Sequence, residues 1–310
     1  IESLEWIGIE HDGDEYIQST KINEHINVVN ELIKNGNAYK CYCSNEEIDA
    51  QKKRAKQKKL PYIYNKKCRN LSEKDAPKDI NPVIRFKSKI DGSSTLNDLV
   101  QGEVKIENMT IEDFIILRKD GTPTYNLTAA VDDHEMEITH IIRGDDHKMN
   151  TFKQMQIFDR LDWKLPTYVH IPLIHTSEGK KLSKRDKAST LEDYKKIGIM
   201  SEALRNYLLR LGWSHGDEDI IPIDKAVDWF DITHVGRGAA RIDFDKLASI
   251  NSHYSRESGD ETLFELIKGP IEERIQSSLD QESITRLKNG IPALKSRAKT
   301  IPELIDNIVF

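Results

Sequence analysis

The stretch that decides the fold covers residues 137–174 and reads EITHIIRGDDHKMNTFKQMQIFDRLDWKLPTYVHIPLI. Residues 137–142 alternate between apolar and polar types, as a half-buried strand does. Residues 149–161 place apolar side chains at helical spacing, and residues 168–174 are again strand-like. A strand, a helix and a second strand in this order predict a βαβ unit, so we expect a parallel sheet and an α/β fold.

The segments before this unit predict helices followed by short strands. Apolar residues recur every three or four positions over 20–36, which is typical of an amphipathic helix. Ser44 and Glu47 form a capping box that opens a second helix. Three β-branched runs predict strands: 83–86, 104–106 and 114–117.

The segments after this unit are predicted to be mostly helical. Ser189 and Glu192 are expected to cap one helix, and Ser201 to begin another that ends at Gly212. Short helices are expected to begin at three prolines: Pro270, Pro292 and Pro302.

Composition limits the function classes. The chain has 310 residues, enough for about two domains. Its 46 basic and 52 acidic residues give a net charge of -6, so a nucleic acid would have to meet a local basic patch. Three cysteines cannot form a disulfide framework, and no apolar run approaches the roughly 20 residues that span a bilayer. We therefore expect a cytoplasmic protein that does not contact the membrane.

Two segments could form such a patch. Residues 180–187 hold five cations, between a predicted strand and a predicted helix. A basic loop at the carboxyl end of a parallel strand can neutralise a triphosphate, although a solvated charged loop is the alternative. Residues 52–59 form a basic helical run that suits phosphate contact or, equally, a solvated helix face. Walker and dinucleotide glycine patterns are absent from the sequence.

A family resemblance begins in the first of these segments. Residues 181–185, KLSKR, resemble the KMSKS loop of class I aminoacyl-tRNA synthetases. Three further runs match bacterial glutamyl-tRNA synthetases in order and spacing: DGTPTYNL at 120–127, VDDH at 131–134 and HIIRGDDH at 140–147. The likeness continues through 202–214 and 244–247 and covers nearly the whole chain.

The resemblance implies a fold and an activity. The fold would be a Rossmann-like class I synthetase catalytic domain with an inserted α+β domain, followed by a mostly α-helical region. The implied domains are the catalytic domain at 1–35 and 110–190, the acceptor-end-binding insertion at 36–109, a stem-contact region at 191–258 and the start of an anticodon-binding region at 259–310. The enzyme would use ATP with Mg²⁺ to convert L-glutamate to glutamyl-AMP, then transfer the glutamyl group to the 3′ end of tRNA(Glu).

The resemblance also implies site residues. Tyr125 would line the amino-acid pocket, and Arg143 would contact the glutamate through a guanidinium suited to carboxylates. Two residues, Asp146 and His147, would border the adenosine pocket, with Lys184 on the ATP phosphates. The catalytic loop residues would be Lys181, Ser183, Lys184 and Arg185. Two alternatives stay open, since Arg143 could form a surface ion pair with Asp145 or Asp146, and Tyr125 could be a core aromatic residue.

The metal content is left open by the sequence. Cys41, Cys43 and Cys68 resemble the zinc site of some members of this family, but Asn70 stands where those members have histidine. Tyr64 could stand in as the fourth ligand, and three reduced thiols are the alternative. Asp132 and Asp133 are interpreted as neighbours on a strand, which face opposite ways and cannot chelate one ion together.

This sequence differs from the family's pattern in ways that leave two alternatives to the implied activity. No HIGH-type motif is present, and we expect that an upstream segment is missing and that the tail is broken off early. The alternatives are a paralogue that charges tRNA(Gln) with glutamate, and a tRNA-binding fragment without activity. No long amphipathic seam suggests a coiled-coil partner, so a monomer is expected.

Overall fold

The structure is a computed structural model that describes residues 1–182 and 190–308, with the backbone alone at Glu73. Contacts divide the chain into two compact units, Asp14–Ile171 and the combination of Ile1–Gly13 with Pro172–Phe310. The division into four functional domains stays a prediction.

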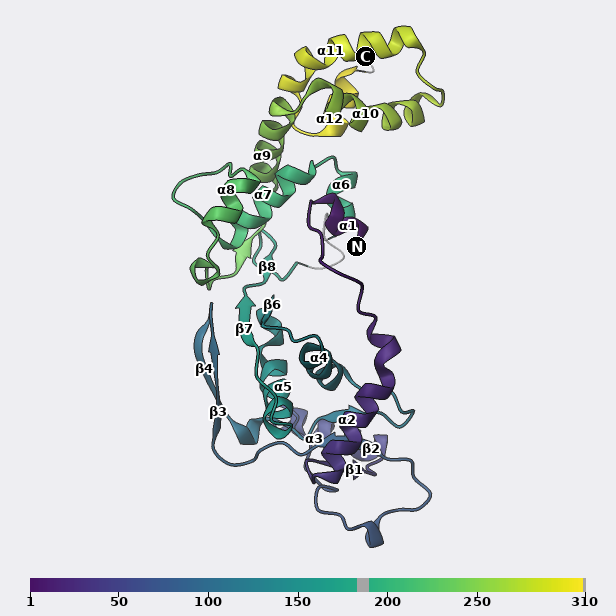
Figure 1. Cartoon of the computed structure of the whole chain (residues 1–310), viewed down its shortest axis with the longest axis vertical. Coiled ribbons are helices and arrows are strands. Elements are labelled where there is room, and N and C mark those ends of the chain that lie inside the picture. Colours follow the sequence, from purple (N-terminus) through teal and green to yellow (C-terminus); the bar gives the residue numbers. More distant parts are fainter. Residues whose placement is uncertain (183–189, 309–310) are drawn as a thin grey trace. The chain divides into compact units, whose positions relative to one another are not determined.

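The first unit contains a four-stranded sheet in the order β4-β3-β7-β6 (Figure 1). Its strands are β3 (Ser93–Asp98), β4 (Gly102–Glu107), β6 (His140–Gly144) and β7 (Thr167–Ile171). β7 pairs in parallel with both β6 and β3, and helix α5 (Lys148–Arg160) connects β6 to β7. The βαβ unit predicted from residues 137–174 is therefore confirmed. Its first strand starts three residues late, and its second ends at Ile171, before the short strand β8 (Ile174–His175).

A second sheet in this unit is antiparallel and has the order β1-β2-β5. Its strands are β1 (Ala38–Cys41), β2 (Val83–Phe86) and β5 (Ile115–Leu117). The predicted strands at 83–86, 104–106 and 114–117 are confirmed as β2, part of β4 and β5.

Helices α2 (Ile22–Lys34), α4 (Tyr125–Glu135) and α5 enclose the core of this unit. Their buried side chains include Leu32, Leu127 and Ile157, each fully inaccessible to solvent. The interpretation of Asp132 and Asp133 as strand residues is wrong, because both lie in α4. Buried residues at Leu127 and Val131, four apart, explain the helix, since that spacing puts both on one face.

The predicted capping box at Ser44 is confirmed at the start of α3 (Asn45–Gln57). The Ser44 hydroxyl accepts the Glu47 backbone N–H at 3.2 Å, and the Glu47 carboxylate accepts the Ser44 backbone N–H at 3.0 Å. These bonds satisfy donors that the first turn leaves unpaired.

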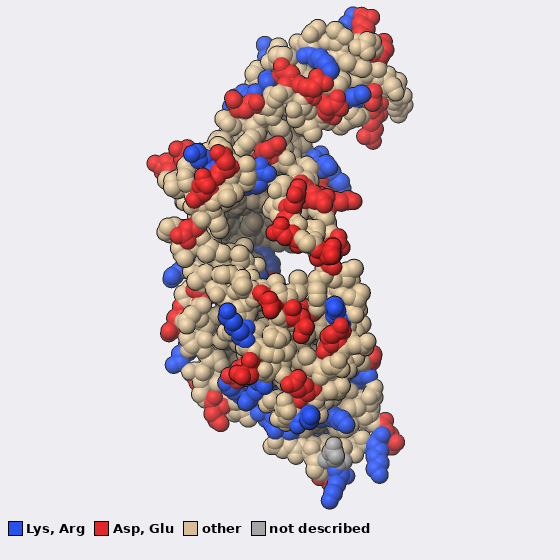
Figure 2. All heavy atoms as spheres, in the orientation of Figure 1, with Lys and Arg blue, Asp and Glu red and all other residues tan. Residues whose placement is uncertain are grey.

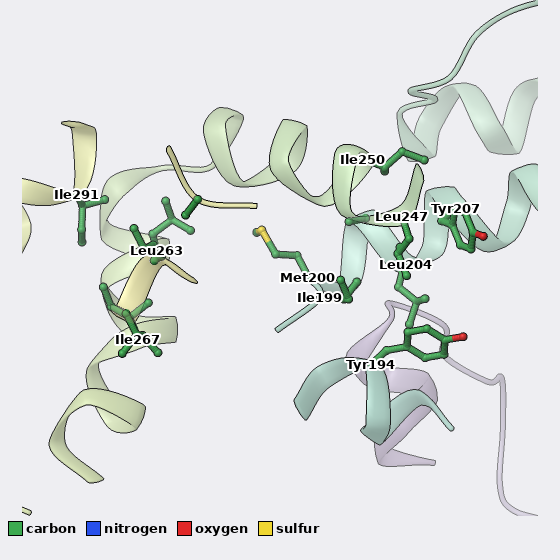
Figure 3. Close-up of a cluster of buried hydrophobic side chains, with 14 of the residues drawn as sticks. Tyr194, Ile199, Met200, Leu204, Tyr207, Leu247, Ile250, Leu263, Ile267 and Ile291 are labelled. Carbon is green, nitrogen blue, oxygen red and sulfur yellow. The ribbon is translucent and has the colours of Figure 1, made fainter. Parts of the chain in front are cut away.

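The second unit is mostly helical, with a large apolar core (Figure 3) and a smaller cluster around Trp213, Ile221 and Ala226. Its α-helices are α1 (Glu2–Trp6), α6 (Leu191–Lys196), α7 (Ser201–Gly212), α8 (Ile223–Trp229), α9 (Phe244–Glu257), α10 (Asp260–Ile275), α11 (Gln281–Leu294) and α12 (Ile301–Ile308). The short strand β9 (Ala240–Arg241) pairs in parallel with β8. Short 3-10 turns complete the chain: Gln18–Lys21, Glu73–Asp75, Asn108–Thr110, Asp145–His147, Ile232–His234 and Lys295–Arg297.

Two predictions about helix starts are wrong in this unit. Pro270 lies inside α10 and Pro292 inside α11, although proline lacks the N–H that an interior position donates. Buried Ile267 and Ile271 flank Pro270, so apolar packing on both sides accounts for the continued helix. Pro302 does lie in the first turn of α12.

The predicted cap at Ser189 and Glu192 is also displaced by one residue. Thr190 caps α6 and exchanges hydrogen bonds with Asp193, three positions on, while Ser189 lies outside the described residues. Both pairs have the same spacing, so the sequence alone did not distinguish them. Among the described residues, no helix is long and apolar enough to cross a membrane.

Candidate active site

The candidate site lies where parallel strands β6 and β7 end in the first unit. Arg143 and His170 occupy paired positions near the carboxyl ends of these strands. The 3-10 turn Asp145–His147 follows β6, and Tyr125 begins α4. Carboxyl ends of parallel strands are where open α/β sheets bind ligands.

Three residues predicted from the sequence come together here. The Nη1 of Arg143 lies 3.4 Å from the Tyr125 hydroxyl, and that hydroxyl lies 3.4 Å from Nδ1 of His147. The Tyr125 and His147 rings meet edge to face, with centroids 5.8 Å apart. Tyr125 is 49% exposed, so the core-aromatic alternative does not describe it.

The rest of the Arg143 guanidinium is held by buried partners. Its Nη2 donates to the Thr151 hydroxyl at 2.6 Å and to the Gln154 side-chain oxygen at 2.9 Å. Both acceptors lie three apart on α5 and are fully buried. The guanidinium carbon also lies 5.5 Å from the centre of the Tyr168 ring. Directed bonds of this kind anchor Arg143 more firmly than an exposed surface ion pair would.

His170 connects Arg143 to a buried carboxylate that the sequence did not single out. The Nε of Arg143 donates to Nε2 of His170 at 3.3 Å, and Nδ1 of His170 lies 2.6 Å from the Asp98 carboxylate. Burial lowers the pKa of His170 despite the neighbouring Asp98. Burial raises the pKa of Asp98, but hydrogen bonds from the Gln101 backbone N–H and the His170 side chain outweigh it, so the pKa lies below its ordinary value.

Asp98 and His170 are brought together by strand pairing, which the sequence pattern does not show. Asp98 ends β3 beside Tyr168 of β7, two positions from His170. The pairing joins positions about 70 residues apart, as the separation of 72 between Asp98 and His170 shows, so local periodicity does not reveal it.

Asp133 lies on α4 and has a perturbed pKa. Burial raises the pKa of its carboxyl group to about 6, although the charge of Arg143 opposes the shift. Its neighbour Asp132 instead accepts from buried His25, at 2.7 Å between His25 Nε2 and the carboxylate oxygen. The two aspartates thus lie in different surroundings, although they are adjacent on α4.

The structure describes only part of the predicted phosphate loop, which belongs to the second unit. Lys181 is exposed and forms a β-bridge with His175. Gly179 has a φ of +81° in the turn before it, where the backbone N–H of Gly179 donates to the carbonyl of Thr176. Ser183, Lys184 and Arg185 lie outside the described residues.

The adenosine-pocket residues occupy the turn after β6. His147 contacts Tyr125, as described above. Asp146 is exposed in the same turn. Asp145 forms an ion pair with Lys148 at 3.6 Å.

The three cysteines form one buried cluster in the first unit. Their sulfur atoms all lie within 4.8 Å of one another. The Tyr64 hydroxyl lies 3.3 Å from the Cys41 sulfur and 3.4 Å from the Cys43 sulfur. Burial raises the pKa of Cys43 to about 12, and it also raises that of Tyr64. The three thiols, with the Tyr64 hydroxyl beside two of them, could supply the four ligands of a zinc site, with Tyr64 in place of the histidine that the sequence lacks.

The second predicted basic segment lies on α3. Lys52 and Lys53 lie on the helix and Lys58 and Lys59 just after it, and all four side chains are exposed. The ammonium of Lys52 lies 6.0 Å from the centre of the Tyr62 ring. Figure 2 shows Lys and Arg atoms mixed with Asp and Glu over the visible face of the molecule.

Comparisons with known proteins agree with the resemblance. Residues 1–249 match the family described as tRNA synthetases class I (E and Q), catalytic domain. The glutamate–tRNA ligase of Pelagibacter ubique is 60% identical over 311 residues, and glutamate–tRNA ligase 2 of Rhodospirillum centenum is 44% identical over 310 residues. All of this chain aligns with each relative, and it spans 66% of the length of each.

Solved structures give the same result for the fold. The crystal structure of a glutamate tRNA ligase from Elizabethkingia meningosepticum, in complex with its amino acid, matches 99% of this chain and 68% of that protein, with a TM-score of 0.84 and 26% identity. The glutamate–tRNA synthetase structure from Elizabethkingia anophelis matches with a TM-score of 0.85 and 27% identity. The predicted α/β, Rossmann-like fold class is confirmed, and the chain belongs to the class I tRNA synthetase family for glutamate and glutamine.

Proposed function

We propose that the protein is a glutamate–tRNA ligase, which activates L-glutamate with ATP and transfers the glutamyl group to the 3′ end of tRNA(Glu). The observation that carries the proposal is the anchored guanidinium of Arg143, whose Nη1 lies 3.4 Å from the hydroxyl of Tyr125, a half-exposed residue. A fixed cation beside a hydroxyl suits a substrate that carries a carboxylate.

In this proposal the residues of the first unit bind and orient the amino acid. Nη1 of Arg143 donates to a glutamate carboxylate, and the Tyr125 hydroxyl adds a second polar contact. Because Thr151 and Gln154 hold Nη2, the cation needs little reorganisation when the substrate binds. Asp146 and His147 border the adenosine of ATP.

The phosphate loop is proposed to act on ATP. Lys181, Ser183, Lys184 and Arg185 would stabilise the charge that develops on the phosphates as pyrophosphate leaves. Mg²⁺ would enter with ATP and neutralise part of the same charge.

We also propose a structural zinc ion held by Cys41, Cys43, Cys68 and Tyr64. The support is the cluster geometry described above. A closed set of four protein ligands is typical of structural zinc and leaves no position for a reacting water. The ion would stabilise the loop that joins β1 to Cys68, within the predicted acceptor-end-binding insertion.

Contact with tRNA is proposed for α3, because exposed lysines suit phosphate oxygens. The monomeric state and the cytoplasmic location stay predictions.

The experiment is pyrophosphate exchange with ATP, carried out with the longest natural form of the chain and repeated with tRNA(Glu), with tRNA(Gln) and without tRNA. Exchange that depends on L-glutamate supports the proposal. Exchange supported by tRNA(Gln) and not by tRNA(Glu) would identify the paralogue. No exchange under any of the three conditions, with tRNA still retained in a parallel filter-binding measurement, would identify a non-catalytic protein and contradict the proposal.

A further inference from the structure

We propose that Asp98 and His170 are positioning residues for Arg143: they fix which end of the guanidinium meets the substrate carboxylate. The inference rests on the proposed function, because it assigns glutamate as the ligand of Arg143. Neither residue touches the exposed part of the site, since His170 is fully buried and Asp98 is 4% exposed.

The Asp98 carboxylate is held in one orientation by backbone donors. Its Oδ1 accepts from the N–H of Val100 at 3.0 Å and from the N–H of Gln101 at 2.8 Å. Its Oδ2 accepts from the backbone N–H of His170 at 3.0 Å and lies 2.6 Å from Nδ1 of the same residue. With the carboxylate fixed, Oδ2 is the atom that determines the proton position on the imidazole ring.

The hydrogen bonds assign one tautomer to His170. An acceptor at 2.6 Å requires the proton on Nδ1. Arg143 Nε is a donor only, so Nε2 at 3.3 Å must present its lone pair to it. The Thr151 hydroxyl, 3.0 Å from Nε2, is compatible with this assignment because it can donate or accept. His170 is therefore neutral, with its proton on Nδ1, and the lowered pKa agrees with this state.

The tautomer in turn orients the guanidinium. Nε is bound to His170, and Nη2 is bound to Thr151 and Gln154. Among the described residues, the hydrogen bond given for Nη1 is the long one to the Tyr125 hydroxyl, at 3.4 Å. The substrate carboxylate would therefore meet the Nη1 end of Arg143, next to Tyr125, and would not span both terminal nitrogens.

Replacing Asp98 by asparagine should reverse this arrangement. The backbone N–H groups of Val100 and Gln101 keep the amide oxygen in the Oδ1 position. The amide NH₂ then takes the Oδ2 position and donates to Nδ1 of His170, which moves the ring proton to Nε2. The backbone N–H of His170, which lies 3.2 Å from Oδ1 and 3.0 Å from Oδ2 in the wild type, keeps only the oxygen at the Oδ1 position as its acceptor. Two N–H groups would then face each other between His170 and Arg143, and the guanidinium would lose its orientation.

The test compares Asp98→Asn, His170→Gln and His170→Asn in the full-length protein. The KM for glutamate, the kcat of pyrophosphate exchange and the melting temperature are measured for each. We expect Asp98→Asn and His170→Asn to raise the KM for glutamate by about 10- to 100-fold, the usual effect of a lost hydrogen bond to a charged group, with a smaller change in kcat. His170→Gln should recover most of the wild-type KM, because a glutamine oxygen can reach the position of Nε2 and accept from Arg143.

Asp113→Asn is the matched control. Asp113 is also fully buried in the first unit, and its carboxylate accepts from the Ser88 backbone N–H at 3.2 Å and from the Tyr39 hydroxyl at 2.8 Å. The Asp113→Asn substitution should lower the melting temperature without raising the KM for glutamate. An unchanged KM in Asp98→Asn, or an equal rise in Asp113→Asn, would overturn the inference.

A spectroscopic readout separates this inference from the proposed function. Nitrogen-15 NMR of the His170 ring should show the proton on Nδ1 in the wild type and on Nε2 in Asp98→Asn. A wild-type ring protonated on Nε2 overturns the inference whether or not the protein has activity. Absence of glutamate-dependent exchange with the expected tautomer present counts against the proposed function alone.

Discussion

Arg143 and Tyr125 lie side by side, with Nη1 of the guanidinium 3.4 Å from the phenolic oxygen, although they belong to different elements. Tyr125 begins α4, and Arg143 lies near the end of β6. The guanidinium is fixed by α5 and β7, while the tyrosine is half exposed. One partner is therefore rigid and the other accessible, which makes the pair the centre of the proposed glutamate site.

The first prediction concerns this pair. Arg143→Lys should lower kcat/KM for glutamate by about 100-fold, because an ammonium cannot reproduce the directed bonds of the planar guanidinium. Tyr125→Phe should lower it by about 10-fold, since only one hydroxyl contact is lost. Steady-state exchange kinetics measure both. Arg118, an exposed residue directly after β5, provides the control Arg118→Lys. An equal loss in that variant would show that the effect is not specific to the site.

The second prediction concerns pH and Asp133. Its pKa is raised to about 6, so the folded state binds the proton more tightly than the unfolded state does. The resulting stabilisation is complete below the unfolded pKa near 3.9 and is lost as the pH rises through about 6. Asp133→Asn should therefore be more stable than wild type at pH 8, by on the order of 1 to 2 kcal/mol, and the advantage should shrink at pH 5.

Urea unfolding at both pH values tests this prediction. Asp79→Asn, the same substitution at an exposed position of the same unit, serves as the control. A constant difference between Asp133→Asn and wild type from pH 5 to pH 8 would contradict the raised pKa.

The third prediction concerns the cysteine cluster. The purified protein should contain one zinc ion per chain, and Cys68→Ser and Tyr64→Phe should both reduce the zinc content after dialysis. Tyr62→Phe is a matched control, because Tyr62 packs against the same cluster but its hydroxyl has no hydrogen-bond partner among the residues that the structure describes. Zinc content is measured by atomic emission. If Tyr64→Phe retains zinc as firmly as Tyr62→Phe does, Tyr64 is not a ligand.

The fourth prediction concerns Gly198, which follows α6 with a φ of +79°. The N–H of Gly198 donates to Lys195 and that of Ile199 to Tyr194, which is the Schellman arrangement at a helix end. A Cβ at this position would lie 2.1 Å from Cδ of Pro302, in α12. Gly198→Ala should therefore destabilise the second unit by about 2 to 4 kcal/mol, from left-handed strain and overpacking together.

Gly216→Ala provides the comparison for that variant. Gly216 also has a positive φ, of +55°, but no atom of residues 1–182 or 190–308 lies within 4 Å of a Cβ built there. We expect a loss of only about 1 kcal/mol in denaturant unfolding. Equal losses in the two variants would mean that contact with Pro302 contributes nothing.

The sequence predicted much of the architecture because the decisive signals are local. Periodicity over 137–174 indicated the βαβ unit, and Ser44 with Glu47 indicated the start of α3. Arg143 and His147 were named through the family resemblance, and the structure places them in β6 and in the turn that follows it. Tyr125 came from the family resemblance.

Long-range contacts account for most of what the sequence did not reveal. The pairing of β3 with β7, which brings Asp98 to His170, leaves no periodic signal, and β3 itself reads as the polar run SSTLND. The interior prolines of α10 and α11 are tolerated because of tertiary burial, which overrides local preference.

The most direct test of the proposed function is the transfer of radiolabelled glutamate to purified tRNA by the longest natural form of the protein, with Arg143→Lys in parallel. We predict ATP-dependent labelling of tRNA(Glu) by the wild type, and labelling reduced by about 100-fold in the variant at low glutamate concentration. No labelling of tRNA by the wild type, or equal labelling by both proteins, would contradict the account.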